Sequence, residues 1–272
     1  MRFLIKKLLK ENFEVISDIS MLSADVLKVA IKNFVILAIK QRSSLNVFSS
    51  IFNVFDKLNY SYAKINDFLK DFKLTIKFTR TLGDKTSGQF KPYTDNEGLL
   101  ILRLSPQEVS KLLEKYVLNN LSQPITEQLI NSMVDNIYND IITEVERDTV
   151  AHELQHAYDS WISKRKYTAS KASIKYRDDY PDEKAPITDK QYYDYLRLPH
   201  EVNARFTETV RKLKLIVKKD DGSFDMVDFE KVKKEFEDNF EGFNLIQPKM
   251  AKRLIKRLYA YYLSVKEKIL NI

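Results

Sequence analysis

The chain of 272 residues contains no cysteine. Disulfide bonds, cysteine-ligated zinc sites, iron–sulfur clusters and thiol catalysis are therefore excluded together. The absence says little about compartment, because a secreted chain can also lack cysteine. Histidine is scarce as well, with three residues, and two of them stand four positions apart.

The chain also lacks a long uninterrupted apolar run. Its most apolar stretch, Val26–Lys40, carries Lys28 and Lys32, so it is too short between charges to span a bilayer and predicts a buried helix. Residues 1–17 are basic and apolar, with no continuous apolar region and no small-residue cleavage site. We interpret them as an amphipathic helix, not a signal peptide, and expect a cytoplasmic protein.

A recognition motif for nucleic acid is absent too, although the net charge is +7 and basic residues concentrate in 1–10 and 249–268. Basic helices can contact nucleic acid, acidic protein or anionic lipid. Lysines that solvate the outer face of a core helix are the commoner explanation. We therefore do not expect a nucleic-acid partner, but the basic terminal helices leave that option open.

Apolar residues make up 44% of the chain and aromatic residues 12%, a globular composition. Residues 1–72 have apolar positions at helical spacing. Leu74–Leu82 alternates and is β-branched, residues 89–93 form a second possible strand, and Leu99–Ser105 forms a third. Helical patterns then resume. The sequence predicts an α+β fold, mostly helical, with a small mixed or antiparallel sheet and helices at both ends.

The second half of the chain is punctuated by prolines. The polar stretch 164–190 contains Pro181 and Pro186 and predicts a long connection or an exposed insertion. A helix is expected to begin near Pro199 and to continue to Val217. Two more helices are expected after Asp225, the last of them from about Pro248. We divide the chain into an N-terminal helical region (1–72), a core (73–217) and a C-terminal helical region packed on the core (218–272).

The stretch TVAHELQHAY, Thr149–Tyr158, contains the two spaced histidines. On a helix His152 and His156 lie on one face, one turn apart, so both imidazoles can bind one metal ion at about 2.0–2.1 Å. Glu153 is displaced from His152 by about 100°. It is therefore not expected to be a ligand in the same plane, but it can take a proton from a metal-bound water.

Coincidence is a weak explanation for this HExxH spacing. With three histidines and 17 glutamates, random placement gives it in roughly 1 such chain in 500. The flanking residues are uncharged, which suits an interior site. The sequence therefore predicts one bound Zn²⁺.

TVAHELQHAY resembles the active-site helix of the zincin metallopeptidases. The order of strands, HExxH helix and later helix is also similar, over roughly residues 74 to 217. The resemblance implies a zincin-like fold with the sheet packed on the HExxH helix. It also implies peptide-bond hydrolysis through a metal-activated water with Glu153 as general base. By the same analogy, the strand Leu99–Ser105 is the sheet edge that pairs with an extended substrate.

The type of zincin depends on the third ligand. A metzincin would have glycine where Asp159 stands and a ligand where Ile162 stands, so that branch is excluded. Tyr195–Arg205 resembles the ligand helix of small gluzincin-like proteins, many uncharacterised and some encoded by phages. The resemblance implies that Glu201, 45 positions after His156, is the third ligand and that the protein is a gluzincin-type endopeptidase.

His200 is the rival ligand, and because neighbouring helical residues point about 100° apart, only one of His200 and Glu201 is expected to face the metal. Asp159 or Glu208 could accept the second N–H of a ligating imidazole. Arg205, four residues after Glu201, could hold that carboxylate or make a surface pair.

A second hypothesis is a zincin-fold structural protein with weak or no proteolytic activity, virion-associated if the chain is phage-encoded. Its partners would be assembly partners, whereas an enzyme would bind a protein or peptide substrate. The presence of Glu153 argues against this hypothesis, because a purely structural site needs ligands but no general base.

Overall fold

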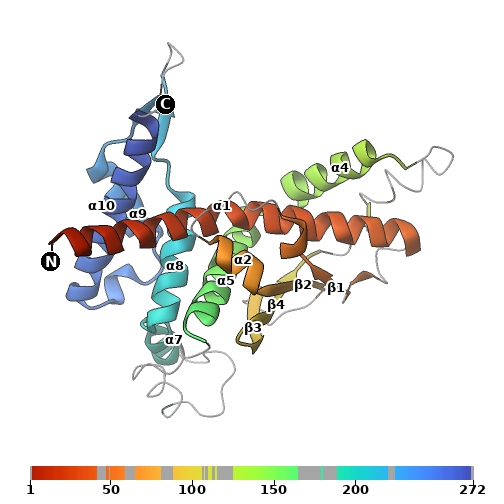
Figure 1. The fold of residues 1–272 in the computed structure, drawn as a ribbon, viewed down its shortest axis with the longest axis horizontal. Helices are drawn as coiled ribbons and strands as arrows, with labels where there is room; N and C mark the ends of the chain where they lie inside the picture. Colours follow the sequence, from red (N-terminus) through yellow and green to blue (C-terminus); the bar gives the residue numbers. More distant parts are fainter. Residues whose placement is uncertain are drawn as a thin grey trace. The chain divides into compact units, whose positions relative to one another are not determined.

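The computed structural model describes residues 2–41, 47–48, 50–58, 65–80, 88–105, 107, 110–111, 114, 125–164, 179, 189–219 and 224–270. The polar connection expected at 164–190 lies largely outside these residues. The fold is α+β, mostly helical with a small mixed sheet, as the sequence predicts (Figure 1). Within the described part of the chain, no helix is long and apolar enough to cross a membrane.

The chain forms two compact units. One comprises Met21–Arg165, and the other comprises Met1–Ser20 together with Lys166–Ile272. The long helix α1 (Arg2–Gln41) contributes residues to both. The boundaries expected at residues 72/73 and 217/218 stay predictions.

The unit Met21–Arg165 contains the four-stranded sheet. Its strands are β1 (Ile51–Asn53), β2 (Lys73–Thr79), β3 (Gly88–Thr94) and β4 (Glu97–Arg103), in the order β1-β2-β4-β3. β2 and β4 are parallel, and the two outer pairs are antiparallel, so the sheet is mixed. Besides its part of α1, the described helices of this unit include α2 (Asn66–Asp71), α4 (Glu127–Asn136), a π-helical turn (Ile137–Ile141) and α5 (Glu144–Ile162).

Two sequence expectations about this sheet are wrong. Residues 1–72 are not helical throughout, because β1 interrupts them; only Phe52 of its three side chains is buried, a pattern too short to outweigh the helical spacing around it. The Leu99–Ser105 segment, β4 in the structure, is not a sheet edge, because β4 lies between β2 and β3. Among the described strands, β3 stands at that end of the order.

Aromatic side chains fill the space around the sheet. The Phe34 ring on α1 lies 5.6 Å from the Phe78 ring on β2 and packs edge-on against it. On the side of α5, the ring of Phe68 on α2 lies 5.5 Å from the rings of Tyr158 and Trp161. α5 also packs against β3 and β4. The HExxH helix is thereby fixed against the sheet at strand β3.

The second unit contains α7 (Asp189–Leu196), α8 (Pro199–Lys212), the hairpin strands β5 (Ile216–Lys218) and β6 (Phe224–Met226), α9 (Phe229–Asn239) and α10 (Pro248–Leu270). The helix starts expected at Pro199 and Pro248 are confirmed. The helix expected to reach Val217 ends at Lys212, because Leu213 and Leu215 are buried alternately with exposed Lys214, a strand-like period. Buried Val202, Phe206, Val232, Phe236, Leu254 and Leu258 form the core of this unit.

Candidate metal centre

α5 begins at a capping box and buries one face along its length. Thr143 and Glu146 form a capping box, in which the Thr143 main-chain N–H donates to Glu146 Oε2 at 2.7 Å and the Glu146 N–H donates to Thr143 Oγ1 at 3.4 Å. Because the buried face carries the histidines as well, they point into the interior. The fully buried apolar residues of α5 are Val150, Ala151, Leu154 and Ala157.

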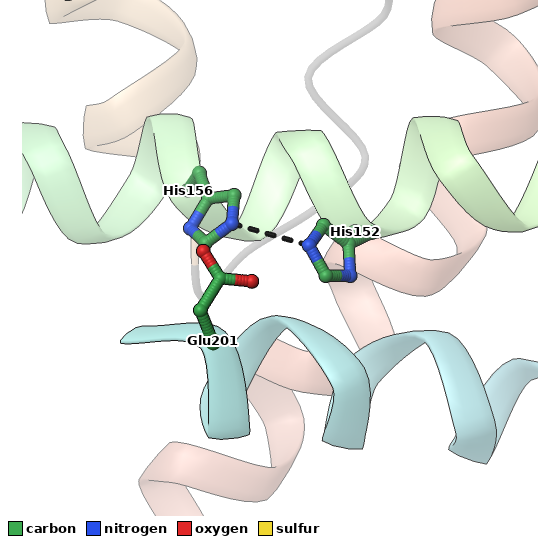
Figure 2. A group of neighbouring side chains, drawn as sticks. All are labelled: His152, His156 and Glu201. Carbon is green, nitrogen blue, oxygen red and sulfur yellow. Dashed lines mark hydrogen bonds between the residues drawn. The ribbon is translucent and has the colours of Figure 1, made fainter. Parts of the chain in front are cut away.

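His152 and His156 face each other on this buried side of α5. Their side chains are 9% and 7% exposed, and their Nε2 atoms lie 3.2 Å apart (Figure 2). Two ligand nitrogens about 2.05 Å from one tetrahedral ion would be about 3.3 Å apart. The observed separation is close to this value, and it is also that of a hydrogen bond between the two imidazoles.

Glu201 supplies the third donor. It lies in the first turn of α8, which begins at Pro199, a residue that is common at the start of a helix. Glu201 is 3% exposed. Among the described residues, His152, His156 and Glu201 form a group whose candidate ligand atoms all lie within 4.8 Å of one another (Figure 2). Two imidazoles and one carboxylate buried together could hold a metal ion.

His200 is beside this group but not part of it. Its Nε2 atom lies 3.6 Å from Oε1 of Glu201, and its side chain is mostly buried. Among the described residues, the group of candidate ligands contains Glu201 and not the rival His200. His200 is placed to interact with the Glu201 carboxylate.

Glu153 does not belong to the ligand group either. Its partly buried carboxylate accepts a hydrogen bond at Oε2 from the main-chain N–H of Phe90 on β3, with a donor–acceptor distance of 2.7 Å. Sequence reasoning missed this contact. It placed a strand at residues 89–93, but every residue except proline has a main-chain N–H, so no residue type marks this one.

The residues expected to support the site have other hydrogen-bond partners as well. Asp159 accepts a hydrogen bond from Nε2 of Gln155 at 2.8 Å, and Arg205 donates to Glu241. Glu208 accepts from Lys212 Nζ at 2.9 Å. Roles for Asp159 and Glu208 as partners of the imidazoles, and for Arg205 as a partner of Glu201, stay predictions.

Tyr158, in the same helix, is shielded by the aromatic rings around it. Burial, with a smaller contribution from the negative charge of Asp159, raises the pKa of Tyr158 to about 12. The phenol is therefore a neutral hydrogen-bonding group at physiological pH.

Comparison with known proteins adds no relative: no protein-family model matches the chain, and neither does any curated protein or any solved structure.

Proposed function

We propose that this chain is a zinc-dependent metallopeptidase with a zincin-like fold and a gluzincin-type ligand set. The observation that carries the proposal is the buried group His152, His156 and Glu201, whose candidate ligand atoms lie within 4.8 Å of one another. It joins the HExxH helix to the glutamate that the resemblance to gluzincins implies. The adjacent Glu153 supports an enzyme and not a purely structural metal site.

The donor set fits zinc better than the common alternatives. Imidazole nitrogen with a carboxylate oxygen suits Zn²⁺, whereas Mg²⁺ and Ca²⁺ prefer oxygen ligands alone. His152, His156 and Glu201 would hold the ion. Zinc bound there would supply Lewis acidity, which polarises a substrate carbonyl and favours deprotonation of water.

Glu153 moves the protons in this proposal. Its carboxylate takes a proton from the attacking water, which then forms a bond to the carbonyl carbon of the peptide. The same carboxyl group gives the proton to the departing amine nitrogen, and the C–N bond breaks. The Oε2 atom of Glu153 is engaged by the N–H of Phe90. We therefore assign the proton to Oε1.

The experiment combines zinc content, measured by mass spectrometry, with hydrolysis of a broad peptide library. Wild type should carry one zinc ion per chain and cleave peptides. Glu153→Gln should keep the ion and lose at least about 100-fold in kcat, because general acid–base catalysis contributes about 10²–10⁴-fold. His152→Ala should lose the ion. The matched control Glu237→Gln, on α9, should change neither quantity.

The proposal fails if wild type binds zinc but cleaves no peptide of the library. That result would favour the structural alternative. It also fails if Glu153→Gln cleaves as fast as wild type, because the proton would then be taken by another group.

A further inference from the structure

We infer that the main-chain N–H of Phe90 positions the carboxylate of Glu153 for catalysis. The inference rests on the proposed function, in which Glu153 is the general base. The hydrogen bond from Phe90 N to Glu153 Oε2 is 2.7 Å long, short for an N–H donor. Bonds of this length to an ionised acceptor are about twice as strong as neutral ones.

The donor is available because of its place in the sheet. Among the strands that the structure describes, β3 pairs with β4 alone, and Phe90 stands opposite Leu100. In an antiparallel pair, alternate residues turn their N–H groups toward the partner strand and away from it. The N–H of Phe90 points to α5, so it is on the outer side. Pro92, two residues further on, occupies an equivalent position, where its missing N–H costs the ladder nothing.

Close packing holds this part of β3 against α5. A Cβ atom on Gly88 would lie 2.5 Å from Cγ2 of Thr149 on α5, closer than real Cβ atoms come. The ring of Phe90 is buried over Gly98, where a Cβ atom would lie 2.3 Å from Cε2 of that ring. The strand therefore approaches the helix at one glycine and is anchored by an aromatic ring next to another.

A main-chain donor on a packed strand can restrict a flexible side chain. Glutamate has three rotatable side-chain bonds, and the bond at Oε2 selects conformers that direct the carboxylate toward β3. Without it, Glu153 would spend more time in other conformers, and fewer enzyme–substrate complexes would have the base in place. Such a loss lowers kcat and leaves metal binding and KM nearly unchanged.

The kinetic test compares Phe90→Pro with Phe90→Ala. Both remove the aromatic ring, but only proline removes the N–H, and the outer side of an edge strand tolerates proline. With zinc content equal, kcat of Phe90→Pro should fall at least about tenfold below that of Phe90→Ala, with KM within about twofold. Equal kcat values for the two variants would overturn the inference.

A second measurement needs neither substrate nor turnover. Amide hydrogen exchange is followed on the full chain labelled with ¹⁵N-phenylalanine, and the Phe90 signal is assigned by its absence from Phe90→Leu. Glu153→Ala should speed exchange of this amide by about tenfold, the effect of losing one hydrogen bond to a charged group, while phenylalanine amides of α9 exchange as before. Unchanged exchange at Phe90 would overturn the inference.

The two tests separate the inference from the proposed function. If wild type hydrolyses no peptide, the proposed function fails, and hydrogen exchange still decides whether Phe90 restrains Glu153. If wild type is active but exchange at Phe90 does not respond to Glu153→Ala, the positioning fails and the metallopeptidase proposal stands.

Discussion

Three buried polar side chains at one point are costly unless something compensates them. Glu201 is 3% exposed, and an isolated carboxylate in an apolar interior loses its hydration without return. His152 and His156 bring two nitrogen lone-pair donors to the same place, and His200 lies 3.6 Å from the carboxylate. A divalent cation among these groups would compensate the negative charge and use both imidazoles. The arrangement is thus one that could hold a metal ion.

The first prediction separates the two adjacent candidates for third ligand. Glu201→Ala should weaken zinc binding by more than about 100-fold, because losing a ligand costs more than losing a supporting residue, which typically costs 10–100-fold. His200→Ala should weaken it by about 100-fold at most, because His200 contacts the Glu201 carboxylate and does not join the ligand group. Competition with a chromogenic chelator measures both affinities. A larger loss in His200→Ala would make His200 the ligand.

The second prediction concerns Tyr158, whose pKa rises from 10.0 to about 12, mainly through burial. The folded protein then keeps the phenolic proton to a higher pH than the unfolded chain does. The stabilisation is fully present below about pH 10 and is lost between about pH 10 and pH 12.

Urea unfolding of wild type and Tyr158→Phe over this range tests it. The free energy of unfolding of wild type, relative to Tyr158→Phe, should be constant up to about pH 9.5 and should then fall. A difference that stays constant to about pH 12 would show that Tyr158 titrates alike in both states.

At the scale of elements, the approach of β3 to α5 depends on Gly88. The Cγ2 atom of Thr149 cannot easily rotate away, because the Thr149 hydroxyl donates to the Val145 carbonyl at 2.8 Å. Gly88→Ala should therefore reduce the free energy of unfolding by about 1–3 kcal/mol.

The matched background is Thr149→Ser, which removes Cγ2 and keeps the hydroxyl. In that background Gly88→Ala should reduce the free energy of unfolding by a smaller amount. The coupling energy in the double-mutant cycle should be about 0.5–3 kcal/mol. Additive effects would mean that the alanine is accommodated by movement of β3 and not limited by Thr149. Chemical denaturation of the four proteins supplies the cycle.

Strands with several alternating or apolar residues could be predicted from the sequence, and short ones could not. β2 and β4 each have seven residues and carry a clear pattern. β1 and β5 have three residues each, which an adjoining helical pattern can absorb. The order of strands is a property of the whole sheet: β3 precedes β4 in the chain yet lies outside it, because β4 pairs in parallel with β2. No local sequence pattern predicts that pairing.

The candidate site could likewise be predicted from the sequence only in part. His152, Glu153 and His156 lie within two turns of one helix, so their spacing alone defines their relative directions. Glu201 comes 45 positions after His156, and only a resemblance to a ligand helix suggested it. The hydrogen bond from Phe90 to Glu153 links positions 63 apart through a main-chain atom. It depends on tertiary packing and has no signature in residue types.

At the scale of the whole molecule, the excess of positive charge is partly carried by α10. Its lysines and arginine at positions 249, 252, 253 and 256 are exposed, whereas Leu254 and Leu258 are fully buried in the core of their unit. This is the arrangement of a core helix with a solvated outer face. The basic residues of this segment therefore form the exposed face of a core helix.

The last prediction concerns the stability of the complete chain. The unfolded chain does not hold His156 and Glu201 together, because 45 positions separate them, so zinc should bind the folded state far more tightly. Free zinc at 100 times its dissociation constant would then add about 2.7 kcal/mol to the free energy of unfolding.

Thermal unfolding followed by circular dichroism measures this stabilisation. Tm should rise by several degrees when zinc is added to chelator-treated protein. It should return to its starting value when the chelator is added again. Magnesium should give no such rise, because it prefers oxygen ligands. Glu201→Ala is the decisive control, because it leaves both histidines of α5 in place and removes the distant ligand. If that variant gained as much Tm from zinc as wild type, the ion would be binding without Glu201, and the three-residue centre would have to be abandoned.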